Sequence, residues 1–86
     1  AGRNLDAKAI HDPLVLANLR NRLGVTLLNL GEPKAAVEFL ASALETRKAV
    51  LTPDHRDSIE TLNNLASAYQ ASGNVTLALP LFEEAV

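Results

Sequence analysis

Apolar residues recur every three or four positions through the first part of the chain, which is the spacing of one face of an α-helix. Asp12 can cap the start of this helix, and Pro13 suits its first position because the N–H that proline lacks has no partner there. Gly31 ends the helix, since glycine adopts the left-handed conformation without a side-chain clash. The residues that form the apolar face are Leu16, Leu19, Leu23, Leu27 and Leu30.

Three further helices are predicted by the same spacing. The second begins after Glu32–Pro33 and has its apolar face at Ala36, Val37, Leu40, Ala43 and Leu44. The segment 51–54 contains a proline and an aspartate and interrupts the pattern. The third helix then carries Ile59, Leu62, Leu65, Ala66 and Tyr69 and ends at Gly73–Asn74. The last starts near Val75 and contains Pro80, which we expect to bend it slightly.

An internal repeat of 42 residues relates segments 17–44 and 59–86. Similarity at a fixed period indicates stacked structural repeats, each too small to bury its apolar face alone. We therefore predict one repeat over 12–53 and a second over 54–86, cut short in its second helix. Residues 1–11 are interpreted as the tail of a preceding repeat's second helix, in a longer array. The identical pairs are Asn21/Asn63, Leu23/Leu65, Gly31/Gly73, Ala36/Ala78 and Ala43/Ala85.

Composition and charge narrow the possible functions. The chain has three aromatic residues and is rich in Ala, Leu and Val, which favours closely packed helices. Without cysteine it can form no disulfide and no thiolate metal site. Its net charge of −2 argues against general affinity for nucleic acid. It contains neither an apolar run long enough to cross a membrane nor a signal-peptide pattern. We therefore expect a cytoplasmic protein with no membrane partner, the alternative being a protein whose targeting segment has been removed.

The repeat resembles the tetratricopeptide pattern of spaced large and small apolar residues. The second segment matches it at Leu62, Leu65, Ala66, Tyr69, Ala78 and Phe82, and the first at Leu23, Gly24, Leu27, Ala36 and Leu40. Arg20 departs from the pattern, because it stands where a large apolar residue belongs. The repeat resembles the kinesin-light-chain-like subclass in its period of 42 residues and in the segment Pro53–Asp54–His55. The segment Leu77–Glu84 is similar to repeats of long bacterial arrays.

The resemblance implies an all-α fold, a right-handed α-solenoid of antiparallel helix hairpins. It also implies a non-enzymatic scaffold without a cofactor, whose concave groove, lined by first helices, holds an extended peptide. Gly24 and Ala66 would let each first helix approach its own second helix. Helical spacing places on the groove face Asn18, Asn21, Val25, Leu28, Asn29, Glu60, Asn63, Ser67, Gln70 and Ala71.

Amide side chains are prominent in this set, and an amide offers the donor and the acceptor that a peptide backbone needs. In the resembling subclass, the asparagine that matches Asn21 and Asn63 contacts the peptide backbone. The alternative is that both asparagines only bond across neighbouring helices. Arg20 and Arg22 suggest an acidic peptide, although two arginines on one helix are also typical of a solvated face. The absence of Lys or Arg at the two asparagine positions argues against binding of chaperone tails.

The spacing of the histidine, aspartate and serine residues argues against metal binding and catalysis. His11 and His55 lack a metal-binding spacing, and Asp54, His55 and Ser58 lie too close along the chain for a catalytic triad. We interpret Asp54 or Asp57 as a helix cap.

Two alternatives to peptide binding are a structural spacer and a self-assembly module. Self-assembly would use apolar surface at the chain's end, formed by Ala78, Leu81, Phe82 and Val86.

Overall fold

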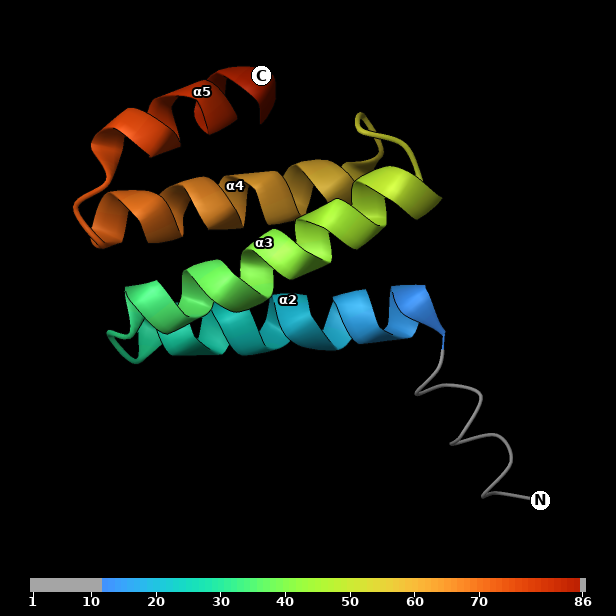
Figure 1. The fold of residues 1–86 in the computed structure, drawn as a ribbon, viewed down its shortest axis with the longest axis horizontal. Helices are drawn as coiled ribbons and strands as arrows, with labels where there is room; N and C mark the ends of the chain where they lie inside the picture. Colours follow the sequence, from blue (N-terminus) through green and yellow to red (C-terminus); the bar gives the residue numbers. More distant parts are fainter. Residues whose placement is uncertain (1–11, 86) are drawn as a thin grey trace.

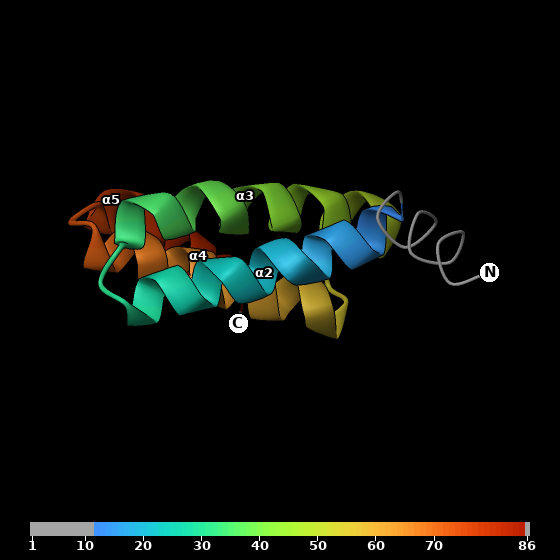
Figure 2. The same ribbon diagram turned by 90° about the horizontal axis from the view of Figure 1, so that it is seen from below.

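The described part of the computed structural model, residues 12–85, consists of two antiparallel helix hairpins (Figure 1). No strand occurs within these residues, so the predicted all-α hairpin fold is confirmed. Helices α2 and α4 lie in one layer and run in the same direction, whereas α3 and α5 form the second layer (Figure 2). The helices are α2 (Pro13–Asn29), α3 (Pro33–Val50), α4 (Arg56–Ala71) and α5 (Val75–Ala85).

The helix ends follow from local side chains. The carboxylate of Asp12 accepts a hydrogen bond from the backbone N–H of Leu14 at 2.9 Å, as predicted for the cap of α2. Gly31 and Gly73 follow the first helix of each hairpin with φ angles of 83° and 89°, the left-handed conformation that glycine allows. The predicted cap of α4 was wrong. His55 occupies that position with extended backbone, and its Nδ1 accepts from the N–H of Asp57 at 3.0 Å.

The hydrophobic core lies where α3 packs against both neighbours, centred on the fully buried Leu40. Gly24 of α2 faces this leucine so closely that a Cβ atom there would lie 2.6 Å from Leu40 Cδ2. The predicted role of Gly24 in close helix approach is thus confirmed. The buried members of the core cluster are Ala36, Leu40, Leu44, Leu62, Leu65 and Ala68.

The apolar face predicted for α2 is exposed at three of its five leucines. Leu19 is 50% exposed, Leu23 49% and Leu30 72%. The buried residues of α2 are instead Ala17, Asn21 and Gly24, because the helix packs closely through small side chains.

Equivalent side chains of α2 and α4 differ in exposure because only α4 has a described helix packed on this side. Thr61 and Leu65 of α4 correspond to Leu19 and Leu23, yet they are 0% and 4% exposed. Helix α3 of the first repeat packs on this side of α4, and no described helix does the same for α2. The leucine face of α2 is therefore an apolar surface without a neighbour among residues 12–85.

Some predictions concern residues outside the described part. The assignment of residues 1–11 to a preceding repeat falls there. Within the described part, the repeat boundaries at residues 12, 53 and 54 stay predictions. Among the described helices, none combines the length and the apolar character that crossing a membrane requires.

Replacement of Leu40 tests how far this core depends on one side chain. We expect Leu40→Ala to lower the free energy of unfolding by about 2–5 kcal/mol, because it removes buried methyl groups and leaves a cavity. The matched control is Leu79→Ala on α5, where the leucine is 55% exposed and the change should be within about 0.5 kcal/mol. Urea unfolding followed by circular dichroism measures both. Equal losses for the two variants would contradict this placement of the core.

Candidate functional site

One charged side chain lies on the buried face of α3. Arg47 follows Leu40 and Leu44 at the spacing of seven and three residues that continues one helix face. The residue is only 5% exposed, and it lies in the last turn of the helix. Burying a guanidinium is costly unless its N–H groups find acceptors, so its partners define the local structure.

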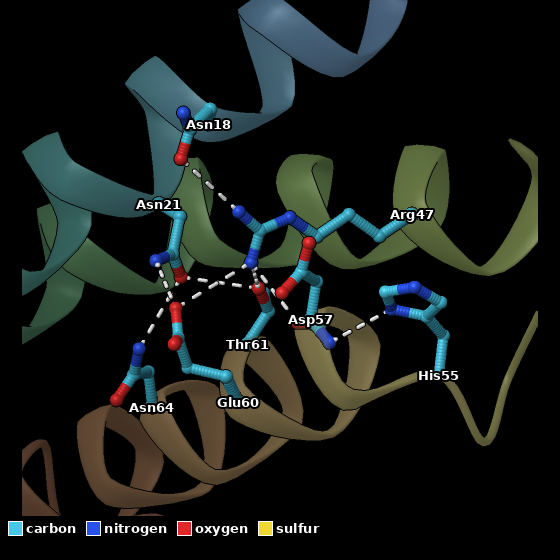
Figure 3. A network of polar contacts seen from close by, with 8 residues as sticks. All are labelled: Asn18, Asn21, Arg47, His55, Asp57, Glu60, Thr61 and Asn64. Carbon is cyan, nitrogen blue, oxygen red and sulfur yellow. Dashed lines mark hydrogen bonds and ion pairs between the residues drawn. The ribbon is translucent and has the colours of Figure 1, made fainter. Parts of the chain in front are cut away.

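The Arg47 guanidinium joins three helices (Figure 3). Its Nη1 donates to the Asp57 carbonyl at 3.0 Å and to Thr61 Oγ1 at 2.6 Å, both on α4. Its Nη2 donates to Asn18 Oδ1 of α2 at 3.3 Å. The carboxylate of Glu60 lies 3.6 Å from Nη1. The charge is therefore balanced mainly by neutral oxygens, with one carboxylate nearby.

Asn21 of α2 completes this network from the opposite side. The residue is 5% exposed, and its Nδ2 donates to Glu60 Oε1 at 3.0 Å. Its Oδ1 accepts from Thr61 Oγ1 at 3.1 Å and from Asn64 Nδ2 at 3.2 Å. Thr61 thus accepts from Arg47 and donates to Asn21, which links α3 to α2 through α4. Every buried side-chain N or O atom of residues 12–85 has a partner, as native interiors require.

A pocket of about 500 Å³ opens beside this network. It lies between the first halves of α2 and α4, and the end of α3 closes it from behind. Its walls combine three apolar residues with polar and charged ones of both signs. The lining residues are Leu14, Val15, Asn18, Asn21, Arg22, Arg47, Leu51, Asp57 and Glu60.

The structure brings together three of the residues predicted for the groove, since Asn18, Asn21 and Glu60 line the pocket. The others lie elsewhere on α2 and α4. Leu28 is partly buried and packs against the hydrophobic core, and Val25 is also partly buried. Farther along the two helices lie Asn29, Asn63, Gln70 and Ala71, which are exposed, and Ser67, which is partly buried.

The sequence interpretation missed Arg47, which holds the pocket together. A signal for it exists: a charged residue at the spacing that continues Leu40 and Leu44 indicates a buried polar contact. Of the two arginines considered for partner binding, Arg22 lines the pocket and Arg20 does not. Leu51 and Asp57 flank the loop between the repeats, and spacing within one helix does not reveal that they converge.

The chemistry that the arrangement offers is hydrogen bonding and charge recognition. No group of three or more potential metal ligands occurs among residues 12–85. His55 serves as a helix cap, and His11 lies outside the described residues. Arg47, Asn21 and Glu60 can donate to or accept from a molecule that enters the pocket.

Comparison with known proteins agrees with the repeat pattern. The family model described as tetratricopeptide repeat matches residues 15–86. Nephrocystin-3 of Xenopus laevis is 37% identical over 70 residues, a stretch that covers 81% of this chain and 5% of the relative. The chain therefore spans a small part of that curated relative. No solved structure gave a significant match.

Substitution of Arg47 tests whether the network holds the helices together. We expect Arg47→Met to lower the free energy of unfolding by about 3 kcal/mol, because Thr61 and the Asp57 carbonyl lose their buried donor. The adjacent Lys48→Met is the matched control. Lys48 pairs with Glu84 at the surface, where such a pair contributes about 0–1 kcal/mol. Urea unfolding compares the two, and a smaller loss for Arg47→Met than for Lys48→Met would contradict the role of the network.

Proposed function

The chain belongs to the tetratricopeptide repeat family, and from this premise we propose that the face formed by α2 and α4 binds an extended peptide segment of a partner protein. Repeats of this family generally mediate protein–protein interactions and are typically non-enzymatic scaffolds. We also propose a cytoplasmic location. Similarity to the kinesin-light-chain-like subclass likewise stays a prediction.

The observation that carries this proposal is the pocket between the two first helices. Helices α2 and α4 lie in one layer (Figure 2), and residues of both helices line the pocket. Its polar lining includes side chains that already hold one another in place, so they need little ordering when a ligand binds. A peptide crossing both helices would reach the pocket between them and the exposed amides of the second repeat, Asn63 and Gln70.

The equivalent residues Asn21 and Asn63 differ in burial and hydrogen bonding. This difference bears on the backbone-binding role that the resemblance implies for both. Asn21 is buried and bonded to Glu60, Thr61 and Asn64, so it positions α4 whatever else it does. Its equivalent Asn63 is exposed and available to a peptide. We propose that Asn63 forms hydrogen bonds with the peptide backbone, and that Asn21 contacts a ligand only from the pocket wall.

Self-association is a second candidate function, and the exposed leucine face of α2 favours it. Within the chain, α3 covers the equivalent face of α4. A second copy whose second hairpin stacks before α2, as the first hairpin stacks before α4, would lay its α5 over Leu19 and Leu23. Such a head-to-tail contact propagates from copy to copy. No particular observation favours the alternative of a structural spacer.

Asn63→Ala tests the groove proposal with little risk to the fold. Peptides selected from a random dodecapeptide display library on the wild type should bind the variant about tenfold more weakly, because one or two backbone hydrogen bonds are lost. Glu38→Ala, at an exposed position of α3, is the control and should bind as the wild type does. Fluorescence anisotropy measures the affinity and circular dichroism the fold. Equal effects of the two variants would count against the groove.

Leu19→Glu tests the self-association candidate. We expect the wild type to show a growing population of larger species in sedimentation velocity as its concentration rises, and the variant to remain monomeric, because a charge on the interface disfavours burial. Val50→Glu changes a similarly exposed apolar residue at the end of α3 and should associate as the wild type does. A wild type that is monomeric into the millimolar range would rule this candidate out.

A further inference from the structure

The charges around the pocket cancel. Its lining contains two guanidinium groups, from Arg22 and Arg47, and two carboxylates, from Asp57 and Glu60. Arg47 is buried, and the Glu60 side chain is 57% exposed, so the site runs from a fixed inner cation to a solvated rim. A ligand that enters therefore meets both signs of charge at short range.

A charged side chain fits this pocket poorly. A carboxylate that approached Arg47 would also approach Glu60, which lies 3.6 Å from the guanidinium. An ammonium group that approached Glu60 would meet Arg47 and Arg22 in the same way. Either ion would lose hydration on entry and would gain attraction and repulsion together, which leaves its desolvation uncompensated.

A neutral amide matches the hydrogen-bonding capacity that remains. A guanidinium has five N–H donors, and three hydrogen bonds from Arg47 to other described residues account for part of them. The bond that Glu60 accepts from Asn21 falls on Oε1, which leaves Oε2 for a ligand donor. The carbonyl oxygen of an amide can accept from the guanidinium while its NH₂ group donates to the carboxylate.

The apolar part of the lining suits the rest of such a side chain. Leu14 and Val15 of α2 and Leu51 after α3 contribute surface against which methylene groups can pack. The volume of about 500 Å³ exceeds that of one amide side chain, which leaves room for the flanking peptide backbone. This extension is consistent with a peptide that continues along the groove toward Asn63.

We propose that the pocket between α2 and α4 is a specificity subsite that takes the amide side chain of a glutamine or asparagine from the bound peptide. The inference rests on the proposed peptide-binding function. It differs from the acidic partner that Arg20 and Arg22 suggest in the sequence, because Asp57 and Glu60 offset the arginines that line the pocket. A neutral side chain suits the pocket because its two positive and two negative charges offset one another.

The test selects ligands and then changes the pocket's charge. A random dodecapeptide display library, screened on the wild-type chain, should enrich Gln or Asn at one position. Synthetic peptides with Gln, Glu, Lys or Leu at that position are then compared by fluorescence anisotropy. We expect the Gln peptide to bind about tenfold more tightly than each of the others, since a polar or charged group left without a partner in the pocket lowers affinity by about this factor.

Two rim variants make the test specific to the pocket. Glu60→Gln keeps an oxygen that can accept from Asn21 but removes one negative charge, so the Glu peptide should gain about tenfold relative to the Lys peptide. Arg22→Gln removes one positive charge and should reverse this preference. Both residues are exposed, and circular dichroism confirms that the helices are retained. Lys34→Gln, at an exposed position of α3 outside the pocket, should leave the order of the peptides unchanged.

The outcomes separate this inference from the function on which it rests. Peptides that bind through Asn63 but show no amide preference would overturn the subsite and leave peptide binding intact. A Glu or Lys preference in the wild type, or an order that neither rim variant changes, would do the same. A library that yields no peptide of any sequence, on a chain shown to be folded, would overturn the proposed function and this inference with it.

Discussion

The arrangement of the helices depends on one buried cation. Arg47 lies on the face of α3 that packs against its neighbours, and there its N–H groups must find acceptors. Those acceptors come from α2, through Asn18, and from α4, through Thr61 and the Asp57 carbonyl. Hydrogen bonds have narrow geometric limits. The network therefore adds directional constraints on the position of one repeat against the next to those of the closely packed core.

The same residues that position the helices also form the pocket. Asn21 bonds to three side chains of α4, so the contrast drawn from sequence between a structural and a ligand-binding asparagine is too sharp. A side chain that is already ordered by its neighbours loses little entropy when it also contacts a ligand. Asn63 has the same place in its repeat but lacks a following first helix among the described residues. Its amide is the freer of the two for that reason.

Much of the fold could be predicted from the sequence, because its determinants are local. Asp12 marks the start of α2 through its side-chain cap and Gly31 marks the end through its left-handed backbone, and the need for a small residue at Gly24 follows from the repeat pattern. The site was harder to predict. Spacing along one helix cannot show that the start of α2, the end of α3 and the start of α4 converge. Arg47 was overlooked because a charged residue is assigned to solvent by default, although its helical position indicated burial.

The leucine face of α2 shows why periodicity alone cannot decide which side of a helix is covered. The stripe that contains Leu19 and Leu23 identifies a surface suited to burial, and the equivalent Thr61 and Leu65 are indeed buried. The difference lies in the neighbour, since α3 packs on α4 and no described helix packs on that side of α2. In a stacked array, burial belongs to the interface between repeats rather than to the repeat. Whatever covers this face, another repeat or another copy, would stabilise α2 and with it one wall of the pocket.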